Sequence, residues 1–184
     1  MLKRLCIIGN ANHAHHIKSS ILAYDEDMLI EMVPSESLQN CSYEHVIIGI
    51  GDNEFRNQCY DKLVALGHHI PTLDLSGDDL KFVFDGRGNQ IFKYAVLYET
   101  SHLGKNIIVN SRAVVEHHVI VNDSTHVCPG AVLLGACSIG SSCKIGANSV
   151  IHPKVKICDN VDIGAMSLVT KNIEKKGTYF GIPC

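Results

Sequence analysis

The sequence predicts a small α/β unit followed by a parallel β-helix, and two observations lead to this fold class. Between residues 91 and 169 every sixth residue is aliphatic, without a slip of register. Before residue 75, short aliphatic runs alternate with segments of helical periodicity. We therefore divide the chain into residues 1–75, a connector at residues 76–90, and a repeat region at residues 91–184.

Residues 1–75 are predicted to form a small Rossmann-like parallel sheet. Apolar runs at residues 5–8 and 46–50 have the composition of buried strands, and a weaker run lies at residues 29–33. Ligands of such a sheet gather at the carboxyl ends of its strands, so the candidate binding loops are residues 9–13 and 51–53. The first loop has one glycine where a dinucleotide loop needs three, which favours a sugar or mononucleotide over NAD.

A helical pattern follows each of the two stronger strands. The first helix is expected after Gly9, and the second from about residue 53 to residue 66. Asp52 can cap the second helix and Gly67 can end it. The expected apolar face of this helix consists of Phe55, Cys59, Leu63 and Leu66.

The connector is rich in glycine and aspartate, and residues 80–84 within it could form a hairpin strand. The repeat that follows is too short for a helix and a return strand, so each hexad is predicted to be one short strand and one corner. Three such sides close a coil of about 18 residues, with the aliphatic residue inside and a small residue four positions later where the wall bends. Turn-forming residues recur one position after the aliphatic. The fourteen aliphatic positions are Ile91, Leu97, Leu103, Val109, Val115, Val121, Val127, Leu133, Ile139, Ile145, Ile151, Ile157, Ile163 and Val169.

Charge and cysteine usage exclude several classes of partner. The net charge of −3, with scattered basic residues, offers no footprint for nucleic acid or an anionic membrane, and no apolar run is long enough to span a bilayer. Eight cysteines at irregular spacing, without a signal peptide, indicate reduced thiols in the cytoplasm. Cys137 and Cys143 fall on small inward positions of the repeat, where we expect them to act as small hydrophobic residues.

The best catalytic candidate in the repeat is His117, two positions after Val115 and therefore outward at a corner. Neutral imidazole suits a general base in acyl transfer. Counting one coil of about 18 residues in each direction places Gly135 on one side of His117 and Glu99 on the other. Gly135 would leave room for a thioester and offer a backbone N–H to an oxyanion, and Glu99 could orient the imidazole ring.

Several motifs together resemble one family. They are residues 51–56 (Gly-Asp-Asn-Glu-Phe-Arg), residues 114–117 (Val-Val-Glu-His), residues 125–131 (Thr-His-Val-Cys-Pro-Gly-Ala) and residues 181–183 (Gly-Ile-Pro). With the hexads, these resemble the hexapeptide-repeat sugar acetyltransferases of the sialic acid O-acetyltransferase and UDP-4-amino-sugar (bacillosamine) N-acetyltransferase type. The resemblance covers nearly the whole chain.

This resemblance implies a left-handed parallel β-helix, a homotrimer with active sites between neighbouring prisms, acetyl-CoA as co-substrate, and no metal. It implies an amino sugar or sialic-type sugar as acceptor, for surface glycan biosynthesis. His117 matches the catalytic base of the family. The residues expected to bind the acceptor are Gly9, Asn12, His13, Gly51, Asp52, Asn53 and Asn110, and those expected near acetyl-CoA are His126, Gly135, Ala147, Gly164 and Ala165.

The sequence departs from the family pattern at two places that matter for the site. The family usually places Asp or Glu directly after the catalytic histidine, and here that residue is His118. The orienting acid would then be Glu116 or Glu99, or absent, and stacking geometry favours Glu99. The acidic residues that the family often carries after its second strand are replaced here by residues 32–35 (Met-Val-Pro-Ser), which weakens the case for a UDP-linked acceptor.

Two other classes of function remain open at this point. A metal-dependent hydrolase of carbonic-anhydrase type can use the same prism, and His117, His118 and His152 loosely resemble its ligand pattern. A β-helix can also serve as a non-catalytic binding module. Finding zinc in the purified protein would support the first class, and failure to bind acetyl-CoA the second.

Overall fold

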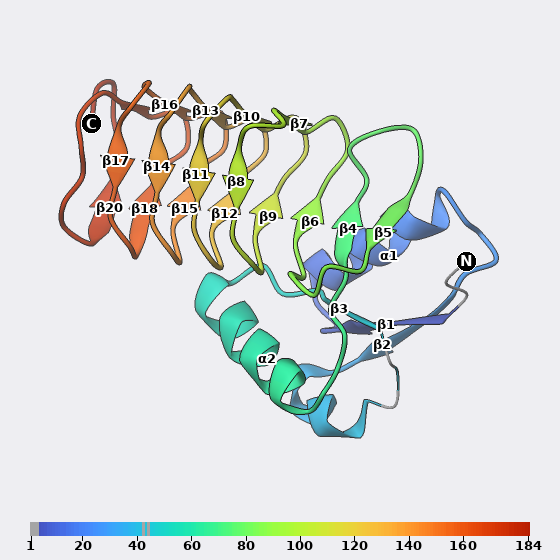
Figure 1. The fold of residues 1–184 in the computed structure, drawn as a ribbon. Helices are drawn as coiled ribbons and strands as arrows, with labels where there is room; N and C mark the ends of the chain where they lie inside the picture. Colours follow the sequence, from blue (N-terminus) through green and yellow to red (C-terminus); the bar gives the residue numbers. More distant parts are fainter. Residues whose placement is uncertain (1–3, 42, 44) are drawn as a thin grey trace.

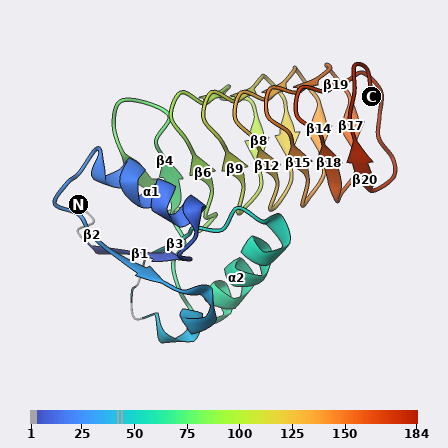
Figure 2. The same cartoon turned by 180° about the vertical axis from the view of Figure 1, so that it is seen from behind.

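The computed structural model describes residues 4–41, 43 and 45–184, which form two parts lying side by side (Figure 1). A small parallel sheet with two helices forms the N-terminal part, and a prism of short parallel strands forms the rest. The view from behind shows the same arrangement, with the N-terminal part beside the first coils of the prism and the C-terminus at its far end (Figure 2).

The N-terminal sheet has the order β2-β1-β3, and all its strands are parallel. Its central strand is almost completely buried, because helices pack against the sheet. This arrangement confirms the three strands and two helices that the sequence predicts. The elements are β1 (Arg4–Ile8), α1 (Asn12–Leu22), β2 (Leu29–Val33), the 3-10 helix η1 (Ser35–Asn40), β3 (Val46–Ile48) and α2 (Asn53–Ala65).

Helix α2 buries a different face from the one predicted. Cys59 and Leu63 are buried as expected, but Phe55 and Leu66 are 43% and 54% exposed, so the prediction is wrong for these two. Arg56 is completely buried in their place. The reason is that α2 packs against the prism as well as against its own sheet. The spacing of apolar residues in the sequence identifies an apolar helix face, but it does not show that a polar residue is buried against a second part of the molecule.

Arg56 joins α2 to the prism through hydrogen bonds to oxygen atoms. Its Nη2 donates to the carbonyl of Ser124 and its Nε to that of Asn106, both in the prism, at 2.8 and 3.2 Å. Nη1 donates to the carbonyls of Ile50 and Gly51 at 3.4 and 3.2 Å. Burial lowers the pKa of this guanidinium to about 10, and the charge of Asp52 acts in the opposite direction. Among the described residues, the hydrogen bonds of Arg56 go to carbonyl oxygens and not to a carboxylate.

The prism has three faces, and strands within a face are offset by one coil: Val115 pairs with Leu97 and Leu133. The β10 face contains β7 (Val96–Leu97), β10 (Val114–Val115), β13 (Val132–Leu133), β16 (Val150–Ile151) and β19 (Leu168–Val169). The β11 face contains β8 (His102–Leu103), β11 (Ile120–Val121), β14 (Ser138–Ile139) and β17 (Lys156–Ile157). The β12 face contains β4 (Thr72–Asp74), β5 (Lys81–Val83), β6 (Gln90–Ile91), β9 (Ile108–Val109), β12 (His126–Val127), β15 (Lys144–Ile145), β18 (Val161–Ile163) and β20 (Gly177–Tyr179).

The β12 face begins before the first hexad. Strand β4 pairs in parallel with β6, and β5 pairs antiparallel with β4, so residues 80–84 do contribute a hairpin strand. Strand β4 was not predicted, because it contains no complete hexad. The division of the chain at residues 75 and 90 stays a prediction.

The aliphatic position of each hexad fills the prism, as predicted. Eleven of the fourteen aliphatic residues belong to its buried core, and the three earliest, Ile91, Leu97 and Leu103, are partly buried against it. Cys137 and Cys143 are fully buried in the same core, and burial raises their pKa values to about 12 and about 11. These thiols are packing residues, since the thiolate form is disfavoured there.

The corners contain left-handed backbone angles at positions that were not predicted from the sequence. Residues three positions after the aliphatic have left-handed backbone angles, for example Arg112, His118 and Ser124, with φ of 60°, 59° and 59°. Such angles cost L-residues roughly 1–2 kcal/mol each. The predicted turn formers stand one position after the aliphatic residue. Glycine is favoured there by lack of room for a side chain and not by its backbone angle, because a Cβ at Gly146 would collide with the backbone of the next coil.

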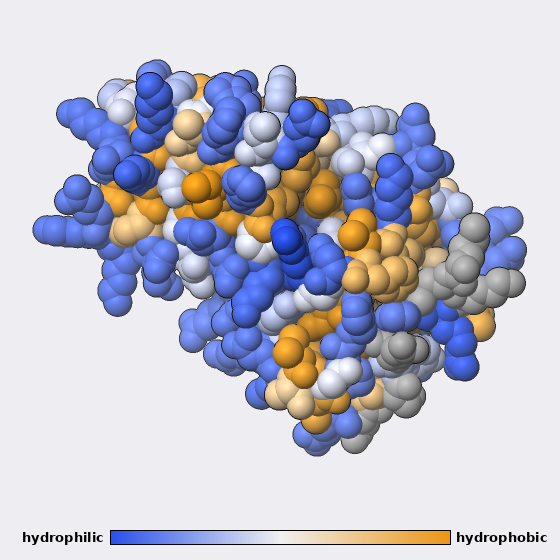
Figure 3. All heavy atoms as spheres, in the orientation of Figure 1, coloured by the Kyte–Doolittle hydropathy of each residue, from blue (hydrophilic) through white to orange (hydrophobic). Residues whose placement is uncertain are grey.

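Three further findings concern the surface, the helices and the cysteines of the described residues. Hydrophilic side chains spread over the prism in Figure 3, with apolar ones between them. Within residues 4–41, 43 and 45–184, no helix combines the length and apolar composition needed to cross a membrane. All eight cysteines are unpaired in this part of the chain.

Candidate active site

His117 lies at the corner between the β10 and β11 faces. Val115 and Val119 on either side of it are completely buried in the prism, which forces the histidine outward. Its carbonyl accepts a hydrogen bond of 2.9 Å from the N–H of Ala136, so the next coil fixes the corner. The imidazole is exposed, as a base that meets a substrate must be.

Gly135 lies against the ring of His117, as counting by one coil predicts. A Cβ atom at Gly135 would lie 2.5 Å from Cε1 and 2.6 Å from Nε2 of His117. No side chain fits there unless the ring moves. The Cε1–Nε2 edge of the His117 ring therefore occupies the space that the missing side chain of Gly135 leaves.

The other ring nitrogen of His117 does not meet a carboxylate. Nδ1 of His117 is 3.0 Å from Nδ1 of His118. The strand register places Glu99 one coil before His117, as predicted. Within the described part of the chain, however, no hydrogen bond joins Glu99 to the imidazole of His117, so the structure does not bring these two predicted catalytic residues together.

Glu116 contacts the proposed oxyanion donor. The N–H of Gly135 donates a hydrogen bond of 3.1 Å to Oε2 of Glu116. This carboxylate is half-buried and lies on the coil before the glycine. Glu116 and Gly135 are therefore part of one hydrogen-bonded corner together with His117.

His126 and Asn110 form a second cluster, on the β12 face. Nδ2 of Asn110 is 3.1 Å from Nε2 of His126, and Oδ1 of Asn110 accepts from the N–H of Ser111 at 2.8 Å. Burial lowers the pKa of His126 to about 3, and the charges of Arg56, His13 and Lys144 act in the same direction. His126 is thus a neutral hydrogen-bonding group at working pH.

His13, at the start of α1, belongs to the same side of the prism. Its Nε2 is 3.0 Å from Oε1 of Gln90, and Nε2 of Gln90 donates to the carbonyl of Ile48 at 2.8 Å. Burial lowers the pKa of His13, and Arg56 adds to this. Gln90 was missed by the sequence analysis. The signal existed, because Gln90, Ile108 and His126 are successive outward residues of one ladder.

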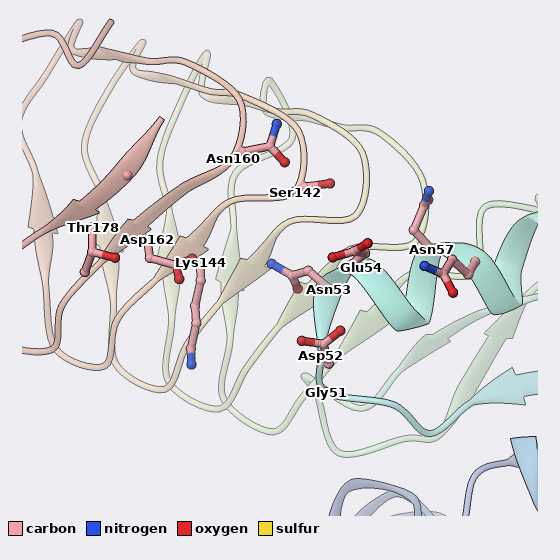
Figure 4. A pocket seen from close by; sticks show the side chains of 12 residues that line it. Gly51, Asp52, Asn53, Glu54, Asn57, Ser142, Lys144, Asn160, Asp162 and Thr178 are labelled. Atoms are coloured by element: carbon pink, nitrogen blue, oxygen red, sulfur yellow. The ribbon is translucent and has the colours of Figure 1, made fainter. Parts of the chain in front are cut away.

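The loop of residues 51–53 borders a cavity of about 770 Å³ between α2 and the β12 face. Oδ1 of Asp52 caps α2 by accepting from the N–H of Phe55 at 2.8 Å, and Nδ2 of Asn53 donates to the carbonyl of Cys143 at 2.8 Å. Figure 4 shows Asp52 and Asn53 at the start of α2, across from Lys144 of the prism. The cavity is polar and is lined by Gly51, Asp52, Asn53, Glu54, Asn57, Gln58, Ser142, Lys144, Asn160, Asp162, Gly177 and Thr178.

The first predicted loop is nearby in the fold. Gly9 has a φ of 116°, and a Cβ there would lie 2.9 Å from the carbonyl oxygen of Gly49, so glycine is required between β1 and α1. Asn12 is the first residue of α1 and is exposed. Both residues lie at the carboxyl end of β1, as expected for a parallel sheet.

Apart from Gly135, the residues expected along the coenzyme lie away from the prism edge of His117. Ala147, Gly164 and Ala165 lie at the corner between the β12 and β10 faces, where the N–H of Met166 donates to the carbonyl of Ala147 at 2.8 Å. His126 lies on the β12 face itself. Within one copy of the chain, His126 lies on the β12 face and His117 lies at the corner between the β10 and β11 faces, so the fold of one copy does not bring these two residues together.

Metal-ligating side chains do not gather in the part of the chain that the structure describes. No group of three or more His, Cys, Asp or Glu residues there could hold an ion. His117 and His118 contact each other, whereas His152 comes about two coils later in the chain.

The repeat region matches a known family model. Residues 136–171 match the model described as bacterial transferase hexapeptide (six repeats). UDP-3-O-acylglucosamine N-acyltransferase from Bordetella pertussis is 30% identical over 80 residues, which are 44% of this chain and 22% of that protein. The chain thus spans about a fifth of the length of the curated relatives it matches.

Solved structures resemble the chain over its whole length. The acetyltransferase domain of PglB from Neisseria gonorrhoeae FA1090 in complex with acetyl coenzyme A has a TM-score of 0.84 at 22% identity, covering 100% of this chain and 98% of that one. A mutant of perosamine N-acetyltransferase from Caulobacter crescentus in complex with CoA and GDP-perosamine has a TM-score of 0.80 at 19% identity, covering 94% and 91%.

These likenesses confirm the predicted fold class, a Rossmann-like α/β unit followed by a left-handed parallel β-helix. The hexapeptide repeat inferred from the sequence also matches the family model over residues 136–171, and the solved acetyltransferase structures share the fold of the chain.

Proposed function

We propose that this protein is an acetyl-CoA-dependent acetyltransferase that acts on an amino or hydroxyl group of an amino sugar or sialic-type sugar, for surface glycan biosynthesis. The observation that carries the proposal is the contact of His117 with Gly135, which places an exposed imidazole against a glycine whose backbone N–H lies in the same corner. The structural neighbours include complexes with acetyl coenzyme A and with CoA and GDP-perosamine.

The reaction would be a direct transfer. Nε2 of His117 removes a proton from the acceptor N–H or O–H as the acceptor atom attacks the acetyl carbon. The N–H of Gly135 stabilises the oxyanion once it is released from Glu116. The C–S bond then breaks, and the proton leaves with coenzyme A as its thiol. No covalent enzyme intermediate is required.

The acceptor would lie in the polar cavity beside α2. Hydroxyl-rich sugars suit a site lined by amides, carboxylates and one lysine. His126, held neutral, and Asn110 would contact the acceptor or the acetyl group at the edge of this site. Gly9, Asn12 and His13 would border it from the N-terminal sheet.

The active unit would be a homotrimer, because one chain separates His117 from His126. The β10 face offers the surface for association: its outward residues form an aliphatic ladder of Val96, Val114, Val132, Val150 and Leu168. The corresponding ladder of the β11 face consists of His102, Ile120, Ser138 and Lys156, and three of these four residues are polar. The cytoplasm is the expected compartment, since a reducing environment suits the eight unpaired thiols.

The test is to incubate the protein with acetyl-CoA and a panel of free sialic-type sugars and UDP- or GDP-linked amino sugars. Mass spectrometry of the sugar is the best readout, because the protein's own thiols would react with a thiol reagent. His117→Ala should abolish transfer while light scattering still shows a trimer, and the exposed His102→Ala is the matched control. Normal acetylation by His117→Ala would contradict the assigned base, and a monomer with full activity would contradict the shared site.

A further inference from the structure

His118 stands where the resembling family carries an acidic residue, and its ring contacts that of His117. Their Nδ1 atoms are 3.0 Å apart, and the rings are nearly perpendicular, with centroids 5.3 Å apart and an angle of 83°. Two ring nitrogens at this distance share a hydrogen bond, with one donating and the other accepting.

The direction of this hydrogen bond follows from what His117 has to do. Its Nδ1 is engaged with His118, so Nε2 is the nitrogen that can take a proton from a substrate. A neutral imidazole carries its single proton on one nitrogen only. For Nε2 to be free, Nδ1 of His117 must hold the proton, and Nδ1 of His118 must accept the hydrogen bond.

The backbone N–H of His118 has a side-chain acceptor, whereas the N–H of Ala136, at the equivalent position of the next coil, has a backbone acceptor. In the next coil, the N–H of Ala136 donates to the carbonyl of His117. The N–H of His118 donates instead to Oγ1 of Thr100, at 3.3 Å. With a φ of 59°, His118 also occupies a left-handed position, which Gly, Asn, Asp and His adopt more readily than most other residues.

We propose that His118 is the positioning residue for His117, accepting a hydrogen bond from its Nδ1–H and so keeping the Nε2 lone pair available. This inference rests on the proposed acetyl transfer. When Nε2 takes the proton of the acceptor, the imidazolium of His117 still donates to His118. The proton departs with the coenzyme thiol after the C–S bond breaks. A neutral ring thus does the work of the carboxylate found at this place in the resembling family.

No charged side chain among the described residues takes the place of His118 as the hydrogen-bond partner of Nδ1 of His117. Glu99 lies on the coil before, and among the described residues no hydrogen bond joins it to either ring. Glu116, in the same corner, accepts from the N–H of Gly135. The coil after carries Gly135 and Ala136, without charge, and Lys154 is the first basic residue at this corner beyond them.

Substitutions at position 118 that keep the left-handed backbone provide the test. His118→Gly removes the acceptor and should lower kcat about tenfold to a hundredfold, with the KM for acetyl-CoA unchanged. His118→Asn restores a neutral acceptor oxygen and should recover most of kcat. His118→Asp should move the acid limb of the pH–rate profile about one pH unit upward, because a carboxylate favours the imidazolium. His102→Asn, on the exposed β11 face, is the matched control.

An activity-independent measurement separates this inference from the proposed function. Long-range ¹⁵N–¹H correlation spectra of histidine-labelled protein, assigned with His117→Ala, should show the proton of His117 on Nδ1 in the unsubstituted protein. A proton on Nε2 would overturn the inference, as would equal kcat and pH profiles in all three variants. If the protein transfers no acetyl group yet keeps the Nδ1–H form, the proposed function fails and the hydrogen bond stands. Should His118→Gly fail to assemble, the shift between His118→Asn and His118→Asp still decides.

Discussion

The N–H of Gly135 donates its hydrogen bond to the carboxylate of Glu116, 3.1 Å away. The donor proposed for the acyl oxygen is therefore engaged by a side chain of the same corner. A thioester carbonyl that accepts from this N–H has to displace Glu116 from it. The carboxylate and the thioester carbonyl thus compete for one donor.

Removing this competition should strengthen acetyl-CoA binding. In Glu116→Ala the N–H of Gly135 is free, and a hydrogen bond of about 1 kcal/mol corresponds to a Kd roughly fivefold lower. Calorimetric titration with acetyl-CoA measures this. Free CoA lacks the carbonyl and is the matched control ligand. An equal gain for both ligands would show that Glu116 does not compete with the acyl oxygen.

Gly135→Ala should displace the proposed base. The new Cβ would lie 2.5 Å from Cε1 of His117, so the ring must move from its present position. We expect kcat to fall about a hundredfold or more, with the melting temperature lowered by only a few degrees, because the ring is exposed and can move. Gly77→Ala is the control, since no atom lies within 4 Å of a Cβ built there. A kcat within threefold of the original would refute this view of the corner.

His126 should make stability depend on acid pH. Its pKa is about 3 in the folded protein against an ordinary value of 6.5, so between these values the unfolded chain binds more protons than the folded one. The free energy of unfolding therefore falls as pH drops below 6.5, by on the order of 2 kcal/mol at about pH 5.

His126→Gln should weaken this dependence, because an amide does not titrate. Urea unfolding at about pH 7 and about pH 5 provides the comparison. His152→Gln removes an exposed histidine instead and serves as control. The interpretation of His126 as a buried neutral group would be wrong if both variants lost the same stability on acidification.

Arg56→Lys should destabilise the protein despite keeping the charge. A lysine ammonium cannot reach the carbonyls that the guanidinium joins, and it would leave Ser124 and Asn106 oxygens without a donor. We expect a loss of about 3 kcal/mol in the free energy of unfolding, measured by urea titration. Arg112→Lys, at an exposed corner, should change it by less than about 0.5 kcal/mol. Equal stability of the two variants would mean that Arg56 is not a link between the parts.

The prism could be predicted almost completely from the sequence, because each hexad repeats the same physical requirement. The one-coil register follows from closing three equal sides, and it placed Gly135 beside His117 correctly. The corner conformation could not be predicted in the same way. Left-handed angles at Arg112 and Met166 are imposed by chain closure, and these residues carry no local preference that would reveal them.

The candidate site was predicted in part. The motif residues could be located, but contacts between distant segments could not. Burial of Arg56 depends on α2 meeting the prism, and the bond from His13 to Gln90 joins residues 77 positions apart. Local periodicity contains no information on such contacts. The choice of Glu99 as orienting acid assumed that stacking alone decides side-chain contacts, whereas the ring of His117 turns toward its own neighbour in sequence.

The constant offset of one coil between paired strands limits how this chain can change in length. An insertion of a few residues between β10 and β13 would carry Gly135 away from His117 and turn every later aliphatic residue to the wrong side. A whole added coil after β19 would leave that pair untouched and only lengthen the prism. Growth and shrinkage are thus expected in complete turns, at the end remote from the N-terminal sheet.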